Sequence, residues 1–263
     1  MTEGSGFQVA HDAPLFYETQ VALFMAPFVQ ALVAATVAPG DAVLDVACGT
    51  GFATRAAAAI AGPAARIEGS DVNPGMIVQA RSVVDDSGAE IAWREASALD
   101  LPYGSGEFDA VICQQGLQFF PDPLVGVREM ARVTRPGGRL GVTAWTPAEQ
   151  SPFLDREMAM LAHHGGGAQA GFSATEEQLR DWFAAGGVDG VAVEVLEIEV
   201  DLPPVSVYVP EHLKALPWAA GFFALPEAEQ AAAVAELDAE LAQYRTAEGI
   251  RIPFTSYLAT ATI

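Results

Sequence analysis

Positive charge is the scarcest property of this sequence. Among 263 residues there are 13 Lys and Arg side chains against 34 Asp and Glu, and Lys214 is the single lysine. The formal net charge of −21 argues against nucleic acid as a partner, because neutralising phosphates requires clustered Lys and Arg. We interpret most of the carboxylates as a solvated surface that favours solubility.

Cysteines and long apolar runs are also few. Cys48 and Cys113 cannot form a disulfide framework or a four-thiolate zinc site, so we expect two reduced, buried thiols and no metal. The longest apolar stretch, residues 21–37, is interrupted by Pro27 and Gln30. It predicts a buried amphipathic helix and no membrane span. The N-terminus lacks the basic cluster and apolar run of a secretory signal, so we expect a cytoplasmic protein.

Two patterns alternate regularly in the first half of the chain. Helical stretches cover 50–61, 74–85 and 124–133. Short runs rich in apolar and β-branched residues predict strands over 42–46, 66–70, 91–95, 108–113 and 139–145. Strands that alternate with helices form parallel sheets, with ligands bound at the carboxyl ends of the strands.

The alternation stops after Trp145. Residues 146–173 contain Pro152 and three consecutive glycines at 165–167, and we predict an inserted, mobile segment there. A helix start at Thr175, an alternating strand over 191–200, a Pro-punctuated helical region over 202–249 and a last strand over 252–261 follow. A strand that returns after a helical insertion predicts a cap on a single domain.

A tight glycine turn follows the first predicted strand in the run VLDVACGTG, residues 43–51. Gly49 and Gly51 allow positive φ and the close approach of a ligand, and the next helix offers unpaired N–H groups. Thr54 stands where a G-x-G-x-x-G motif has its third glycine, and no P-loop lysine follows, which weakens a nicotinamide-dependent oxidoreductase or a nucleoside triphosphate site. Asp45 would repel a pyrophosphate and stabilise a ligand with ammonium and sulfonium charges.

The turn resembles the first motif of class I S-adenosylmethionine-dependent methyltransferases, in the variant of the methyltransferase type 11 domain family that has Ala47 in place of the first glycine. The resemblance implies a methyl-donor site formed by Asp45, Ala47, Cys48, Gly49 and Gly51. At the end of the second strand, Asp71 can accept hydrogen bonds from both ribose hydroxyls. Val72 and Met76 would flank the adenine ring, although a core role for Met76 stays open.

Later segments extend the resemblance over residues 43–145. Ser97 stands where the family usually has an Asp that meets the adenine amine, and Ala98 would offer its backbone N–H. Residues 106–122 are similar to the fourth strand and its loop, which lies beside the transferable methyl group in the family. Gln114, Gln118 and Phe119 would therefore line the site, while Phe120 is expected in the core.

The resemblance implies an α/β fold class: a Rossmann-like, doubly wound, seven-stranded sheet, mostly parallel with an antiparallel last strand, plus helical cap insertions. A single methyltransferase domain would span 1–263, with an N-terminal helical cap over 1–40, a donor-binding core over 41–146, cap insertions at 147–174 and 202–249, and the C-terminal part of the sheet at 175–201 and 250–263. The implied cofactor is S-adenosyl-L-methionine, with S-adenosyl-L-homocysteine as product.

Methyl transfer from a sulfonium depends on alignment, proximity and exclusion of water, without a covalent protein nucleophile. Where a general base assists, histidine is the natural candidate at neutral pH. His163 and His164, in the inserted segment, are candidates, although exposed loop histidines are an alternative; the sequence does not place His11 or His212. Tyr17 matches a tyrosine that closes over the donor in similar proteins, and a helix-packing role for it is equally open.

The cap segments are rich in Phe, Trp, Leu and Pro and poor in cations. We therefore expect a small, apolar or aromatic acceptor, uncharged or cationic, methylated on O, N or C, with no nucleic-acid or membrane partner. The chain is expected to be a monomer or a homodimer. The alternative is a protein of the same fold that binds S-adenosylmethionine without transferring methyl, as a cyclase-like catalyst or a scaffold.

Overall fold

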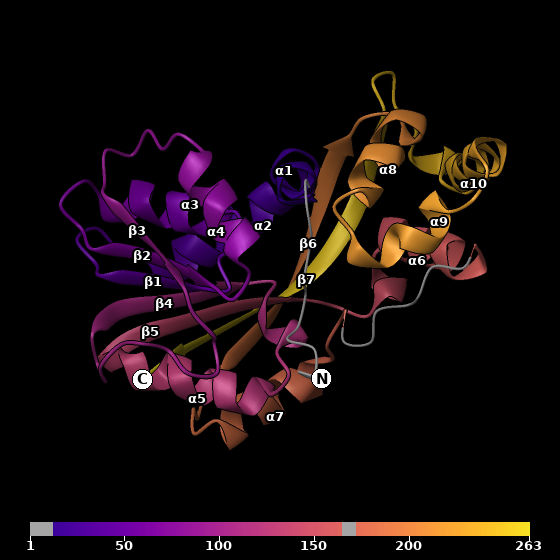
Figure 1. Cartoon of the computed structure of the whole chain (residues 1–263). Coiled ribbons are helices and arrows are strands. Elements are labelled where there is room, and N and C mark those ends of the chain that lie inside the picture. The colour runs from indigo at the N-terminus through magenta and orange to yellow at the C-terminus, as the bar shows by residue number, and fades with distance from the viewer. Residues whose placement is uncertain (1–12, 165–171) are drawn as a thin grey trace, which may run out of the picture.

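The computed structural model describes residues 13–164 and 172–263, and its centre is one seven-stranded sheet in the order β3-β2-β1-β4-β5-β7-β6 (Figure 1). The strands from β1 to β5 are parallel to one another, whereas β7 is antiparallel to both β5 and β6. The predicted sheet, mostly parallel with an antiparallel last strand, is confirmed. The strands are β1 (Val43–Val46), β2 (Ile67–Asp71), β3 (Ile91–Glu95), β4 (Phe108–Gln114), β5 (Thr134–Trp145), β6 (Ala192–Leu202) and β7 (Ile250–Thr262).

Helices cover both faces of this sheet (Figure 1). One face carries α2 (Ala22–Thr36), α3 (Phe52–Ala61) and α4 (Pro74–Ser82), and the other carries α5 (Pro123–Val133) and α7 (Glu176–Ala185). Ala53 and Ala57 of α3 lie one turn apart and pack with Leu32 of α2, because small side chains let the two helices approach closely. Val127 of α5 and Phe183 of α7 belong to the core on the opposite face.

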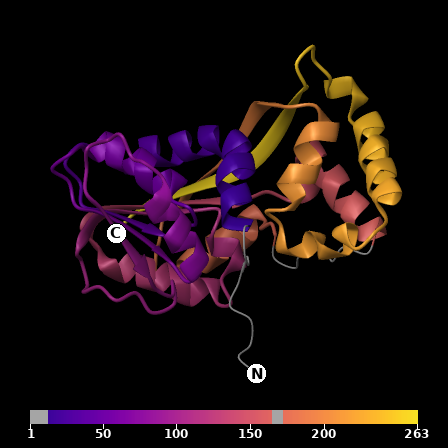
Figure 2. The same cartoon turned by 45° about the horizontal axis from the view of Figure 1, so that its top comes forward.

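A cap stands on an extension of the sheet, beyond the carboxyl end of β5. Trp145, the last residue of β5, pairs with Ser256, but β6 and β7 stay paired as far as Leu202 and Ile250. The cap helices pack around this two-stranded extension, as the turned view in Figure 2 shows. They are α6 (Pro152–His163), α8 (Val205–Leu213), η4 (Pro217–Ala219), α9 (Ala220–Phe223), α10 (Glu227–Glu240) and η5 (Ala242–Tyr244).

The prediction of an irregular, mobile segment over 146–173 is wrong for the part that forms α6. Pro152 is at the start of this helix, where its missing N–H costs nothing. Phe153, Met160 and Leu161 are buried in the cap core, and this burial stabilises a helix that the sequence pattern did not reveal. The three glycines at 165–167 lie outside the described residues.

The N-terminal part enters the cap as α1 (Ala13–Phe16), followed by the π-helix η1 (Tyr17–Val21) and then α2. None of the described helices is by itself long and apolar enough to cross a bilayer; the segments Pro14–Val21 and Phe24–Thr36 meet such a length and composition criterion only as a pair bent by 81°. Phe28 and Leu32 of α2 are fully buried in the protein. The two cysteines are buried and free, as predicted.

Candidate functional site

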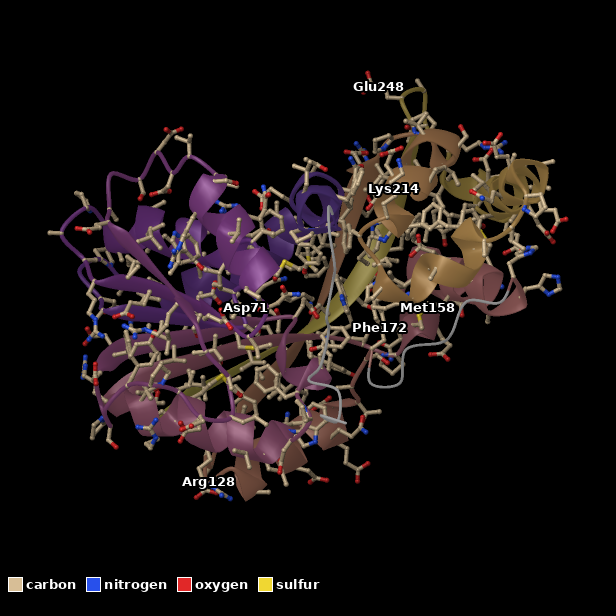
Figure 3. The ribbon with its side chains drawn as sticks, viewed as in Figure 1. Asp71, Arg128, Met158, Phe172, Lys214 and Glu248 are labelled. Carbon is tan, nitrogen blue, oxygen red and sulfur yellow. The ribbon has the colours of Figure 1, made fainter. Side chains whose placement is uncertain are left out.

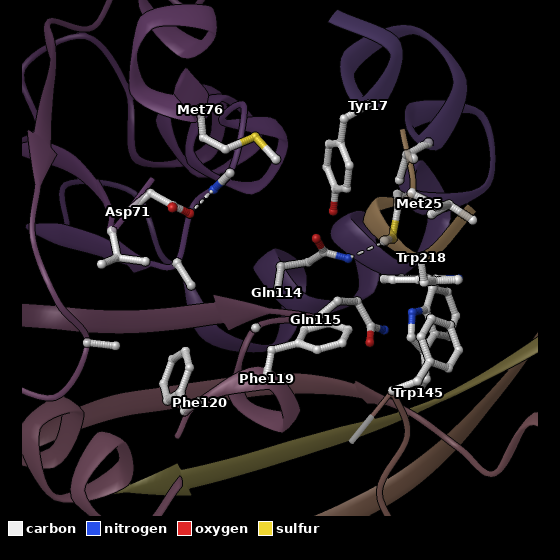
Figure 4. A pocket seen from close by; sticks show the side chains of 18 of the residues that line it. Tyr17, Met25, Asp71, Met76, Gln114, Gln115, Phe119, Phe120, Trp145 and Trp218 are labelled. Atoms are coloured by element: carbon white, nitrogen blue, oxygen red, sulfur yellow. Dashed lines mark hydrogen bonds between the residues drawn. The ribbon is translucent and has the colours of Figure 1, made fainter. Parts of the chain in front are cut away.

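A cavity of about 270 Å³ opens at the carboxyl ends of β1, β2 and β4, between the sheet and the cap. Figure 3 places Asp71 on the sheet side and Met158 and Phe172 on the cap side of this region. The close view in Figure 4 shows two groups of lining residues: Asp71 and Met76 at one end, and Trp145 and Trp218 at the other. The cavity therefore has a sheet half and a cap half.

The glycine turn after β1 has the backbone that the sequence predicts. Gly49 and Gly51 have φ angles of 54° and 93°, and Ala47 also has a positive φ of 56°, a region that costs a non-glycine residue free energy. Ala47 and Gly49 line the cavity. A Cβ atom on Gly49 would lie 3.8 Å from Cε1 of Tyr17, so the missing side chain leaves room between the turn and that ring.

Asp71, at the end of β2, lies in the sheet half of the cavity. Its Oδ2 accepts a hydrogen bond from the Gly49 N–H at 2.8 Å, and its Oδ1 accepts one from the Asn73 N–H at 2.8 Å. Burial raises the pKa of Asp71, and the backbone donors of Asn73, Gly49 and Val72 partly offset that effect. A carboxylate can accept about four hydrogen bonds, so Asp71 keeps acceptor capacity for a ligand.

Asp45, Cys48 and Gly51 do not line the cavity. The fully buried Asp45 accepts a hydrogen bond from the Thr54 hydroxyl through Oδ2 at 2.6 Å, while Oδ1 has no partner among the described residues. Burial raises the pKa of Asp45 to about 7. Asp45 thus lies beneath the turn, and Thr54, which stands where a dinucleotide fold has glycine, is its partner.

The predicted adenine-side residues Val72, Met76, Ser97 and Ala98 all line the sheet half. Val72 is exposed, whereas Met76 is buried. The Ser97 hydroxyl accepts a hydrogen bond from Leu99 N–H at 3.2 Å. These residues follow β2 and β3, so neighbouring parallel strands deliver them to one edge of the sheet.

Gln114 ends β4, and Gln115 and Gln118 follow it. The structure places Gln115, rather than the predicted Gln118, in the cavity wall. Gln114 lines the cavity, with its Nε2 3.1 Å from Sδ of Met25 (Figure 4). Gln118 does not line it, because its amide turns inward and donates to Gln115 Oε1 at 3.1 Å. Gln115 lines the cavity instead, with a φ of 53° and a hydrogen bond from its Nε2 to Ser256. Phe119 and Phe120 both line the cavity, although Phe120 was expected in the core.

Tyr17 covers the boundary between the two halves. Its ring stacks on Phe52 with 6.0 Å between centroids, and its hydroxyl points into the cavity toward Gln114 (Figure 4). The adjacent Glu18 forms an ion pair of 2.6 Å with Arg55 of α3, which ties the π-helix to the sheet domain. Burial, followed by the charge of Asp71, raises the pKa of Tyr17 above its ordinary value, so the phenol stays protonated.

The structure does not bring His163 and His164 into this cavity. They end α6 and line a separate, smaller pocket with residues of α10, including Glu236 and Glu240. His11 lies outside the described residues. The histidine in the main cavity is His212 of α8, beside Glu157 of α6. No spacing pattern in the sequence indicates this pair, since the two residues belong to helices that meet only through the packing of the cap.

The cavity wall is apolar and aromatic, with negative rather than positive charge. Among the described residues that line it there is no Lys or Arg; Asp71 and Glu157 are the carboxylates. An anion would meet repulsion and no compensating cation in this low-dielectric site. The aromatic residues of the wall are Tyr17, Phe24, Phe119, Phe120, Trp145, Phe172 and Trp218.

Comparison with known proteins identifies the segment that builds the sheet half. Residues 43–138 match the family model described as "Methyltransferase domain". A demethylmenaquinone methyltransferase of Beutenbergia cavernae is 32% identical over 151 residues, 55% of this chain and 60% of that protein. Uncharacterized proteins of Mycobacterium tuberculosis and Mycobacterium bovis are 38–43% identical over 108–123 residues. The chain aligns with 38–44% of the length of these mycobacterial proteins.

Solved structures share the fold at low sequence identity. The YcgJ protein of Bacillus subtilis superposes with a TM-score of 0.60 at 17% identity, covering 89% of this chain and 97% of that one. The [4+2]-cyclase SpnF gives a TM-score of 0.52 at 21% identity, covering 99% and 88%. These findings support a class I S-adenosylmethionine-dependent methyltransferase, with the family's domain matched over residues 43–138. Membership of the narrower type 11 family stays a prediction.

The sheet half suits the methyl donor of this family. Asp71 offers acceptor capacity for ribose hydroxyls, and the missing Cβ of Gly49 leaves room above the turn. Asp71 is the carboxylate of the sheet half, with no Lys or Arg among the described lining residues, which favours a cationic ligand over a phosphate. The residues present therefore fit an adenosyl ligand with a positive charge.

Proposed function

We propose that this protein transfers a methyl group from S-adenosylmethionine to a small, apolar or aromatic molecule held in the cap half of the cavity. One observation carries the proposal: a single cavity joins the Asp71–Gly49 turn to a wall of aromatic side chains without cations. The names of the demethylmenaquinone methyltransferase relatives support a ring-containing acceptor, although the aligned segment is largely the donor-binding part.

Each end of the cavity has a separate task. Asp71 would accept the ribose hydroxyls, Val72 and Met76 would enclose the adenine, and Ser97 and Ala98 would meet its polar edge. The bound donor supplies an electrophilic methyl group on a sulfonium. Tyr17, Gln114 and Phe119 line the passage between the halves and would align the acceptor and exclude water, the two effects on which a displacement of this kind depends.

Two measurements test this proposal in sequence. Calorimetry should show binding of S-adenosylhomocysteine and none of NADH. Mass spectrometry with methyl-labelled donor should then find a labelled product among neutral phenols, quinols and amines, and none among carboxylates or oligonucleotides. Absence of S-adenosylhomocysteine binding would contradict the donor site. Tight binding with no product from any acceptor would favour the alternative, a cofactor-binding protein that acts as a cyclase-like catalyst or scaffold.

A further inference from the structure

Three buried polar side chains meet at the cap half of the cavity, and two of them, Glu157 and His212, line it. Glu157 lies on α6, while Tyr208 and His212 lie one turn apart on α8. His212 Nε2 is 3.4 Å from Glu157 Oε2, and His212 Nδ1 is 3.2 Å from the Tyr208 hydroxyl. Glu157 and His212 are each 2% exposed and Tyr208 is 1% exposed. Polar groups this deeply buried are stable only with hydrogen-bond partners.

The hydroxyl of Tyr208 organises this cluster. Burial, followed by the charge of Glu157, raises the pKa of Tyr208 well above its ordinary value, so the hydroxyl keeps its one proton. It lies 3.2 Å from the Gln20 carbonyl and 3.2 Å from His212 Nδ1. When it donates to Nδ1, the neutral imidazole carries its proton on Nε2, which faces Glu157 Oε2.

The second oxygen of Glu157 has no such partner. Among the described residues nothing hydrogen-bonds to Oε1, although the atom is buried. Glu157 lines the cavity beside Leu154 and Met158 of the same helix, and no Lys or Arg of the described lining neutralises it. An unsatisfied buried acceptor is costly, and a ligand that donates a hydrogen bond would remove that cost.

We propose that Glu157 is the carboxylate that selects and deprotonates the acceptor, and this inference rests on the methyl-transfer function proposed above. The acceptor is an apolar or aromatic molecule with an O–H or N–H group, which donates to Glu157 Oε1. As its heteroatom bonds to the methyl carbon, the methyl–sulfur bond breaks with its electron pair on sulfur, and the acceptor proton passes to Oε1. His212 is a positioning residue, and Tyr208 orients it.

Binding of three matched probes tests the selection directly, without turnover. We would titrate the full chain, saturated with S-adenosylhomocysteine, with 2-naphthol, 2-methoxynaphthalene and 2-naphthoate, and follow the fluorescence of Trp145 and Trp218 in the cavity wall. We expect naphthol to bind about tenfold or more tightly than the other two, because the ether cannot donate and the carboxylate is repelled. Equal binding of naphthol and the ether by the native protein would overturn the proposal.

Variants locate the effect at one carboxylate. In Glu157→Gln, naphthol affinity should fall about tenfold, since a neutral amide accepts more weakly than a carboxylate, and discrimination against naphthoate should shrink. Turnover with an accepted phenol should fall about a hundredfold or more, because the proton acceptor is gone. Glu149→Gln, an exposed residue just before α6, is the matched control and should change neither value.

A test of His212 as a positioning residue requires a measurement that a change in folding alone would not alter. His212→Gln can still donate to Oε2 and should keep more of the selectivity for naphthol than His212→Phe. A purely structural role predicts the reverse order, because Phe fills an apolar site better than Gln.

Affinity for S-adenosylhomocysteine, measured with every variant, separates the two proposals. Absence of S-adenosylhomocysteine binding in the native protein would contradict the proposed function. Intact binding together with native probe selectivity in Glu157→Gln would defeat only the role of Glu157.

Discussion

The backbone N–H of Gly49 donates a hydrogen bond of 2.8 Å to Oδ2 of Asp71. Gly49 follows β1 and Asp71 ends β2, and these strands are parallel neighbours with Val46 opposite Ser70. The same carboxylate that we assign to the ribose therefore also holds the glycine turn in its left-handed conformation. Donor binding and the shape of the turn are coupled through this one side chain.

Replacing Asp71 by Asn tests the ribose assignment while keeping the side-chain shape. We expect the affinity for S-adenosylhomocysteine to fall about 30-fold, corresponding to about 2 kcal/mol, because charge-assisted hydrogen bonds become neutral ones. Isothermal titration calorimetry measures the change, and a thermal unfolding curve checks that the turn persists. Native affinity in a folded Asp71→Asn protein would contradict the ribose assignment.

Gly51 and Gly62 both have a φ of 93°, but Gly51 has a ψ of 21°, in the left-handed region, whereas Gly62 has a ψ of 171°. A Cβ on Gly51 would overlap the Trp93 ring, whereas a Cβ on Gly62 would meet nothing within 4 Å. Gly62→Ala should cost about 1–3 kcal/mol of unfolding free energy from strain alone, because only glycine normally adopts its conformation. Gly51→Ala should cost about 1 kcal/mol from strain and about 1–3 kcal/mol more from overpacking. A loss of about 1 kcal/mol or less in Gly51→Ala, measured by urea unfolding, would show that Trp93 moves aside freely.

Asp45 should make stability depend on pH. Its pKa in the folded protein is raised from 3.8 to about 7, so the folded state binds the proton more tightly than the unfolded state does. The contribution is fully present below pH 4 and is lost as the pH rises through about 7. Asp45→Asn should therefore gain stability relative to the native protein between pH 4 and pH 8, by on the order of 4 kcal/mol. Parallel urea titrations across this range measure the difference, and a constant difference would refute the expectation.

The start of α7 offers a stability test away from the cavity. Thr175 accepts from the Gln178 N–H at 3.1 Å, and the Gln178 side chain accepts from the Thr175 N–H at 2.8 Å. Thr175→Ala should destabilise the fold by about 1 kcal/mol. Because both bonds form one capping box, Thr175→Ala combined with Gln178→Ala should cost less than the two single changes added together. Strict additivity in a double-mutant cycle would contradict this coupling.

Local signals predicted the sheet half well. Consecutive residues around Gly49 encode the strand, the glycine turn and the helix. The parallel strands β1 and β2 bring Asp71 to the same edge of the sheet. The cap half was harder to predict from the sequence. Pro152 looked like an interruption but starts α6, and the contact between Glu157 and His212 depends on how α6 and α8 pack.

The exchange of Gln118 for Gln115 has a similar cause. It follows from the positive φ of Gln115. This conformation favours glycine, so a glutamine at this position does not predict it. The family resemblance therefore placed Gln118 in the cavity wall, where the structure has Gln115.

The pairing of Leu202 with Ile250 closes the far end of the β6–β7 ladder, and Gly249 packs directly against the Leu202 carbonyl, where a Cβ would not fit. The two points at which the chain departs for α8 and comes back from η5 are thus immediate neighbours. A short hairpin could replace the segment between them, residues 203–249, without interrupting β6 or β7. Such a graft site lets the part of the acceptor wall that α8 and η4 supply, including His212 and Trp218, be exchanged as a module while the adenosyl half stays unchanged.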